Sequence, residues 1–268
     1  MIRALLVGHL TWNIPLLITF AIVTLIYLIQ LNKLRPLKSY KQIMLFLVGW
    51  WLLYLIIGSP LLAISYLSFS FHMIQMSLLY FIIPPLILLG IPRDMYKRLV
   101  NHRFIRPLTI RLISPKAALI IFSILFFMYH LPFVLTIITQ QALFQQSFLT
   151  LLFFLSFFMW WPISSPDPKA RLKSQARKKF VFQSGMYIMP ACLMFIVSAL
   201  LEGASNPFLG EMMTAHLCLP QDSSIEVLPP PFNTKYDQIL AGCFMMGLHK
   251  GGLMVTCKLE SHMKSFIP

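Results

Sequence analysis

Charged residues are scarce in this chain, and acidic residues are the scarcer of the two signs. Only 11% of the 268 residues are charged, with 8 Asp or Glu against 22 Lys or Arg, whereas 58% are hydrophobic. A soluble globular domain carries about 25% charged residues, so the composition excludes that class. The apolar residues form continuous runs and do not alternate with polar ones, which excludes a transmembrane barrel. We therefore expect an all-α, polytopic integral membrane protein.

Seven apolar runs are long enough to cross a bilayer, for which a helix needs about 20 residues. They lie at residues 10–31, 43–64, 70–91, 117–138, 147–163, 180–201 and 237–257. The first run has its basic cluster after it, which is the wrong polarity for a cleaved signal peptide. No internal repeat is visible, so we expect one seven-helix membrane domain over residues 1–268.

The basic residues are concentrated in alternate connections. Most of them lie at residues 32–42, 92–116 and 164–179, and none lies at 65–70 or 139–146. The positive-inside rule then predicts an outer N-terminus, a cytoplasmic C-terminus and an acidic outer connection at 202–236. This topology accounts for the net charge of +14, so we expect membrane lipid and no nucleic acid as a partner.

The third run carries an ionisable residue one turn inside its edge. His72 and Met76 are four residues apart, so they share one face of a helix. An imidazole beside a thioether suits a soft metal ion, and copper(I) is the first candidate. The competing interpretation is structural: a histidine that hydrogen-bonds at the headgroup level and methionines that pack as ordinary apolar residues.

Further candidate ligands lie at comparable depth. His130 in the fourth run and Met245 in the seventh are each expected about 12 Å below the outer surface. A competing interpretation makes His130 a neutral imidazole bonded to a carbonyl that Pro132 frees. Cys218, in the acidic connection, has no outer partner among the four cysteines and is a further candidate ligand.

Prolines and tryptophans predict two structural features. Pro84 and Pro85 remove two backbone donors from the third run, so we expect a kink there that neighbouring helices compensate. Trp160 and Trp161 end the fifth run, where an aromatic belt is expected to anchor the helix at the membrane interface.

The seventh run combines small residues with a cation. Gly242, Gly247, Gly251 and Gly252 favour close contact between helices. Lys250 lies deep in the same run and either snorkels to the inner interface or is a buried functional cation.

Several short segments stand in an order that resembles a known family. They are Gly58-Ser59-Pro60, HMIQM from His72 followed by PPLILLGIP, Tyr129-His130-Leu131-Pro132, Met159-Trp160-Trp161-Pro162, Pro190-Ala191-Cys192, LCLPQD from Leu217, and Asp237-Gln238 with Gly242 and Met245. Together they resemble the CtaG-like cytochrome c oxidase assembly factors, especially those of Gram-positive bacteria. The resemblance implies a seven-span protein of the bacterial cytoplasmic membrane that is needed to build active haem-copper oxidase. Oxidase subunits and an extracytoplasmic copper carrier are the partners that it suggests.

Two positions depart from the family pattern. Many relatives carry a histidine where this chain has Met76, and another near the outer end of the fifth run, where this chain has Gln145, Gln146 and Ser147. Replacing an imidazole by a thioether shifts a metal site towards copper(I).

Three functions are compatible with these residues. The first is a non-enzymatic assembly factor that delivers copper through a His/Met site in the outer half of the bundle. The second is a copper or small-solute transporter, which needs polar residues that continue to the inner side of the membrane. Apart from His249 and Lys250, the inner halves of the predicted spans are apolar, which favours the first function. The third is a haem protein with His72 and His130 as axial ligands, for which no CxxCH motif is present. No serine, histidine and carboxylate fall at one depth, so we expect no enzyme.

Overall fold

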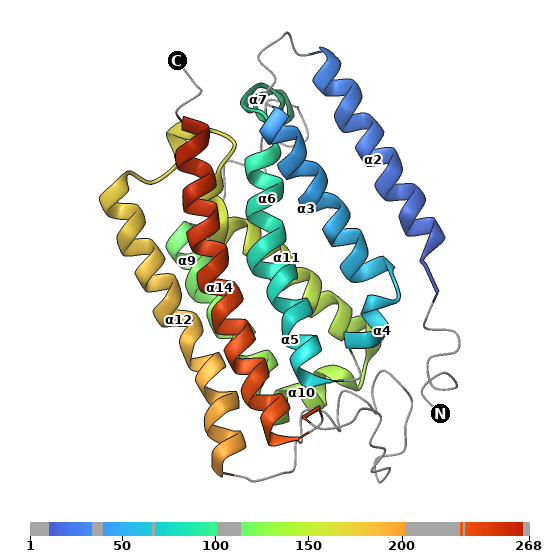
Figure 1. The fold of residues 1–268 in the computed structure, drawn as a ribbon, viewed down its shortest axis with the longest axis vertical. Helices are drawn as coiled ribbons and strands as arrows, with labels where there is room; N and C mark the ends of the chain where they lie inside the picture. The colour runs from blue at the N-terminus through green and yellow to red at the C-terminus, as the bar shows by residue number, and fades with distance from the viewer. Residues whose placement is uncertain are drawn as a thin grey trace.

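The computed structural model describes residues 11–33, 40–65, 68–100, 114–201, 231–232 and 234–264 of the protein. Within these ranges the regular elements are helical, and they form one bundle (Figure 1). The predicted all-α membrane fold is confirmed. The elements are α2 (Ile14–Lys33), α3 (Tyr40–Gly58), α4 (Leu61–Ser65), α5 (Phe69–Ser77), the π-helical turn η1 (Leu78–Ile82), α6 (Ile83–Gly90), α7 (Arg93–Val100), α9 (Pro115–Tyr129), α10 (Pro132–Thr139), α11 (Ala142–Ser164), the 3₁₀ turn η2 (Pro168–Ala170), α12 (Ser174–Leu201) and α14 (Lys235–Lys264).

Six helical segments in the described part of the chain are long and apolar enough to cross a membrane. The fourth predicted span is not one of them, because it is divided into the shorter helices α9 and α10. The break falls at His130 and Leu131, and Leu131 has extended backbone angles. Pro132 explains the break, since proline lacks a backbone N–H and disfavours the helical conformation of the residue before it.

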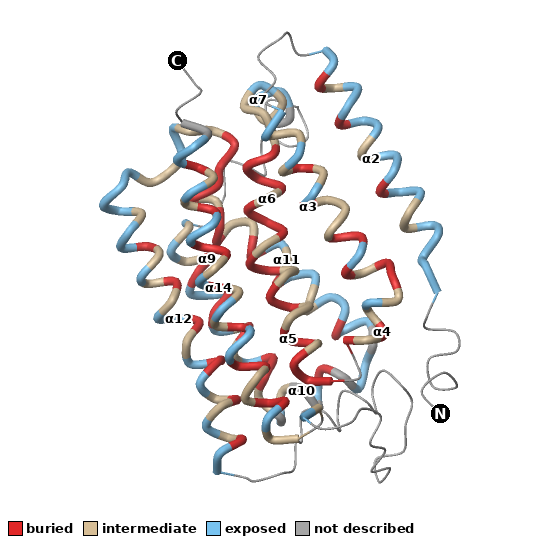
Figure 2. The backbone as a smooth tube through the Cα atoms, viewed as in Figure 1, coloured by how far each residue is buried: buried red, intermediate tan, exposed pale blue. Residues whose placement is uncertain are grey.

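The continuous segment α5–η1–α6 forms the centre of the bundle. In its apolar stretch 72% of the residues are buried, against 17% in α2. α3, α11 and α14 pack against this segment, whereas α2 and α12 lie at opposite edges (Figure 1). Buried residues accordingly follow α5 and α6, and exposed ones predominate on α2 (Figure 2). The central position of α5 places its side chains away from lipid.

Pro84 and Pro85 follow the π-helical turn and begin α6. Pro84 lacks the N–H that would bond to the carbonyl of Tyr80, four residues earlier. The indole N–H of Trp160 donates to that carbonyl at 2.9 Å, so a neighbouring helix compensates as the sequence predicts. Trp160 is buried in the core. Its interpretation as an interfacial anchor is therefore wrong, because this polar atom is needed inside the bundle.

The segments that carry most basic residues adjoin one end of the bundle, which we call the basic end. α2, α6 and α14 end there, and α3 and α12 begin there (Figure 1). The opposite end contains α4, the start of α5 and the start of α14. This arrangement agrees with alternate basic connections. The outer position of the N-terminus stays a prediction, and residues 202–230 of the acidic connection lie outside the described residues.

Candidate functional site

Asp237, near the start of α14, binds the N-terminus of α5. One carboxylate oxygen accepts the hydroxyl of Ser68 at 2.8 Å and the N–H of Ser70 at 3.2 Å, and the other accepts the N–H of Phe69 at 2.9 Å. Asp237 is fully buried. A carboxylate is stable here because the first N–H groups of a helix lack partners within the helix and carry partial positive charge. This contact fixes the first turn of α5, which carries His72.

A cavity of about 360 Å³ lies beside α5 at this end of the bundle. His72 and Met76 both line the cavity, as their spacing on a helix predicts, and both residues are buried. Other polar side chains in the lining come from neighbouring helices, among them Tyr129 of α9 and Gln145 of α11. The predicted His/Met pair therefore faces a cavity whose other walls come from α3, α4, α9 and α11.

His130 lies at the C-terminus of α9 and is buried. Its ring Nδ1 lies 2.6 Å from the carbonyl oxygen of Phe126, which in a longer helix would accept the backbone N–H of residue 130. Because a carbonyl only accepts, Nδ1 must carry the proton, and the lone pair of a neutral ring is then on Nε2. Nε2 has no hydrogen-bond partner among the described residues. The predicted bond to a carbonyl near the helix break is present, but its acceptor is Phe126 and not Met128, the carbonyl four residues before Pro132. The lone pair of Nε2 can accept a hydrogen bond or bind a metal ion.

The four predicted membrane ligands do not all line the cavity. His130 packs edge-to-face against Phe195 of α12, with ring centroids 5.1 Å apart. Met245 of α14 is fully buried in the same hydrophobic core as Met76. Neither His130 nor Met245 is part of the cavity lining. Cys218 lies outside the described residues, so its predicted role stays a prediction.

The donor set of the cavity is uncharged, and it includes one imidazole, His72, and one thioether, Met76. Among the described residues, no three His, Cys, Asp or Glu side chains come together, so no cage of the kind that zinc prefers is formed there. Copper(I) accepts few ligands and favours thioether and imidazole, which Met76 and His72 supply. The chemistry of the lining therefore fits copper(I) better than a harder ion.

Two contributions to this site were not predicted from the sequence. Asp237 supports α5 from a position 169 residues away from Ser68. Gln238, its neighbour, donates to the carbonyl of Phe195 at 3.1 Å and so joins α14 to α12. A sequence signal for the first contact exists, because Ser68 and Ser70 precede an apolar run as a helix-capping pattern and a carboxylate starts the last span.

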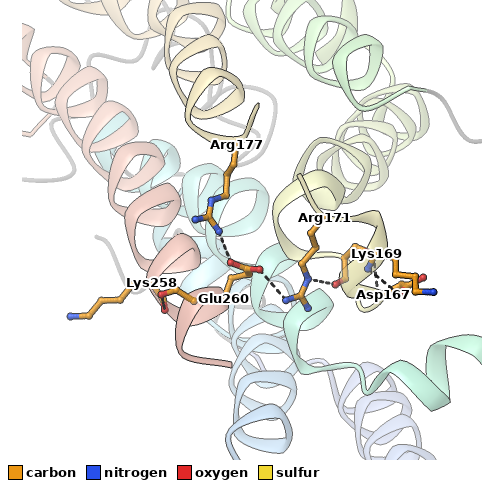
Figure 3. Close-up of polar contacts among 8 residues, drawn as sticks. Asp167, Lys169, Arg171, Arg177, Lys258 and Glu260 are labelled. Atoms are coloured by element: carbon orange, nitrogen blue, oxygen red, sulfur yellow. Dashed lines mark hydrogen bonds and ion pairs between the residues drawn. The ribbon is translucent and has the colours of Figure 1, made fainter. Parts of the chain in front are cut away.

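A second buried polar cluster lies at the basic end. Glu260 of α14 accepts from Arg171 at 3.4 Å and from Arg177, which lie before and in the first turn of α12 (Figure 3). Arg171 also donates through Nε to the carbonyl of Ser165 at 2.7 Å. Burial lowers the pKa of Arg171, and the charge of Glu260 opposes that shift. This cluster fastens the end of α14 to the connection between α11 and α12.

Comparison with known proteins places most of the chain in one family. A family model described as cytochrome c oxidase caa3 assembly factor (Caa3_CtaG) matches residues 25–257. No curated protein and no solved structure matched the chain. The match covers both α5 and α14, which form the two sides of the Asp237 contact.

Proposed function

The chain belongs to the cytochrome c oxidase caa3 assembly factor family, and we propose that it delivers copper(I) during oxidase assembly. In this proposal the protein is a non-enzymatic, multi-pass protein of the bacterial cytoplasmic membrane. Copper is its cargo, received from an extracytoplasmic copper carrier and passed to an oxidase subunit. The cavity beside α5 is the proposed copper-binding site, at the end that the predicted orientation places outside.

The observation that carries the proposal is the shared cavity of His72 and Met76. The family resemblance suggests a histidine in relatives at Met76 and another within Gln145–Ser147, and Met76, Gln145 and Gln146 all line the cavity. Their convergence on one cavity supports a metal site whose ligand set has become softer, because a thioether replaces an imidazole. Unrelated substitutions in structural positions have no reason to meet in one cavity.

Transfer from this site requires ligand exchange only. Copper stays in the +1 state when the entering carrier or client ligand replaces His72 or Met76, so no electron donor or acceptor takes part. Two protein ligands leave coordination positions open for such exchange. His130 Nε2, Met245 and Cys218 are proposed as further ligands.

Aromatic side chains favour delivery on one side over passage through the membrane. Tyr80 lies one turn beyond Met76, and its ring meets that of Phe122 at 5.7 Å between centroids. Phe122 stacks on Phe126 at 5.4 Å, and all three rings are buried. A transporter needs a polar path at this level. The described core instead holds packed aromatic rings between the cavity and the basic end.

The test is copper binding by full-length protein under reducing conditions. We expect His72→Ala and Met76→Leu each to weaken copper(I) binding by about tenfold or more. Loss of a residue that only hydrogen-bonds to a metal ligand already lowers metal affinity by about tenfold, and loss of the ligand itself should cost at least as much. Oxidase maturation in cells should fall in parallel, normalised to the abundance of the protein in the membrane. The measurement is competition with a chromogenic copper(I) chelator.

Met73→Leu is the matched control. Met73 lies on the same helix and is as buried as Met76, but it does not line the cavity. It should therefore keep wild-type copper binding. Wild-type copper(I) binding in both His72→Ala and Met76→Leu would reject the site. If the abundance of the protein and oxidase maturation fell together while copper bound per folded protein stayed normal, the two residues would have only a structural role.

A further inference from the structure

A second cavity of about 360 Å³ lies between α12 and α14, nearer the basic end. It includes Gly185 and Met186 of α12, and Lys250 and Met254 of α14. Met254 is 74% exposed, and Figure 2 shows exposed residues along both helices. In a membrane protein apolar exposure alone identifies only the lipid-facing surface. The glycines and the lysine of this groove need a separate explanation.

The glycines of α14 have two different environments. A Cβ at Gly242 would lie 2.8 Å from the carbonyl oxygen of Cys192, and one at Gly252 would lie 2.8 Å from that of Phe81. These two glycines allow helices of the same chain to approach closely. A Cβ at Gly247 or Gly251 would meet nothing within 4 Å. The second pair therefore has the spacing of a membrane helix-packing motif, but no helix of the described chain packs on it.

Gly185 of α12 extends this open surface, since a Cβ there would also meet nothing within 4 Å. Gly185 lines the cavity, whereas Gly247 and Gly251 are not part of its lining and belong to the open surface of α14 that adjoins Lys250. Such a surface lets the backbone of another helix approach closely, which is how helices associate in lipid. We call the cavity with Gly185, Lys250 and Met254, together with the adjoining open positions Gly247 and Gly251 of α14, the α12/α14 groove.

Lys250 adds a charge to the groove. At 1.5 Å per residue it lies about 20 Å from Asp237 and about 15 Å from Glu260 along the axis of α14. The side chain is exposed, and it forms no ion pair or hydrogen bond with the described residues. A four-carbon stem cannot bring the ammonium to the level of Glu260. A cation at this depth is costly in lipid unless an acidic group accompanies it.

We propose that the α12/α14 groove docks a transmembrane helix of an oxidase subunit that carries a carboxylate opposite Lys250. The glycines admit the helix backbone, and the carboxylate neutralises the lysine in a medium where opposite charges attract strongly. The identity of the partner as an oxidase subunit rests on the proposed function. The position and chemistry of the contact rest on the groove itself.

A second copy of this chain is the wrong occupant on charge grounds. Among the described residues, the other carboxylates, Asp94 and Asp167, lie outside the helices that are long and apolar enough to cross a membrane, and the remaining four follow the sixth apolar run in the sequence. Asp237 and Glu260 already bind donors near the ends of α14. Two copies that met symmetrically along α14 would also bring Lys250 close to Lys250. The complementary residue must therefore come from a different membrane protein.

The experiment is photo-crosslinking in native membranes with a benzophenone-bearing residue in place of Met254 in the full-length chain. We expect a crosslinked product that contains an oxidase subunit. Its yield should fall at least fivefold with Lys250→Met, and also with the double variant Gly247→Leu and Gly251→Leu, which adds bulk to the open surface of α14 where a Cβ would meet nothing within 4 Å. Lys250→Arg should retain the crosslink, because the charge is kept.

Two controls separate docking from folding and from copper binding. Ala21→Leu places a leucine at an exposed residue of α2, away from the groove, and should leave the crosslink unchanged. Copper bound per folded protein should stay at the wild-type level in Lys250→Met, whereas His72→Ala should lose copper and keep the crosslink. A product that contains only a second copy of the chain, the absence of any protein crosslink, or a yield unaffected by both groove variants would overturn the proposal.

Discussion

Two buried carboxylates lie near the two ends of α14, and they are held in different ways. Asp237 accepts three hydrogen bonds from neutral donors at the start of α5. Glu260 at the basic end accepts from two arginines, Arg171 and Arg177 (Figure 3). Both residues are at most 1% exposed, so burial does not distinguish them. The difference lies in the charge of the partners.

The partners follow from where the chain places its cations. Basic residues are concentrated in the segments at the basic end, so arginines are available to Glu260 but scarce near Asp237. A helix N-terminus supplies the alternative, since its N–H groups favour a negative charge without a full cation. The cluster at Glu260 is therefore an ionic anchor. The contact at Asp237 instead joins a carboxylate to the first turn of the helix that carries His72.

The largest expected effect comes from breaking the ionic anchor. Glu260→Ala leaves two arginines without their shared carboxylate, one of them buried to 6% side-chain exposure. Removing one partner of a buried ion pair costs about 3–5 kcal/mol. We expect a loss of that order in the free energy of unfolding, measured by SDS titration in mixed micelles. Copper bound per folded protein should not change, and a selective loss of copper would mean that the two ends of α14 are coupled.

Replacing Asp237 by Asn should cost less stability but more function. The amide keeps the shape of the side chain and loses the charge that three donors share, and hydrogen bonds to charged groups contribute about 1.5–3 kcal/mol. We expect a destabilisation of about 1–3 kcal/mol by the same titration. We also expect weaker copper(I) binding, because the first turn of α5 carries His72. Glu260→Gln is the matched control, and equal copper affinity in the two variants would make Asp237 purely structural.

The features of the fold and of the candidate site that the sequence predicts depend on residues that are close together in the chain. The apolar runs identify the spans, the four-residue spacing puts His72 and Met76 on one face, and Pro132 explains why the fourth span is broken. Each of these depends on residues close in sequence, for which helix geometry is sufficient. The expected kink at Pro84 also follows from its own chemistry.

The parts that the sequence does not predict depend on how helices rotate against one another. The Trp160 to Tyr80 bond and the Asp237 to Ser68 bond join residues that are 80 and 169 positions apart. Nothing local distinguishes a tryptophan that anchors a helix at the interface from one that donates to a carbonyl in the core. Membrane depth alone predicted that His130 lies near His72. In the structure the ring of His130 packs against Phe195, and His130 is not part of the cavity lining.

The smallest expected effect concerns an exposed ion pair at the same end as Glu260. Arg93 Nε lies 3.3 Å from Asp167, with side chains 41% and 28% exposed. Water and salt screen such a pair, so its contribution is about 0–1 kcal/mol. Asp167→Ala alone would overstate the pair, because Asp167 also accepts the N–H of Lys169 at 3.2 Å. A double-mutant cycle with Arg93→Ala isolates the coupling by SDS titration. The coupling free energy of the Arg93–Asp167 pair should thus be much smaller than the loss of unfolding free energy in Glu260→Ala. If the two values were similar, burial would not explain why Glu260 is a strong anchor, and charge complementarity alone would explain the stability of the basic end.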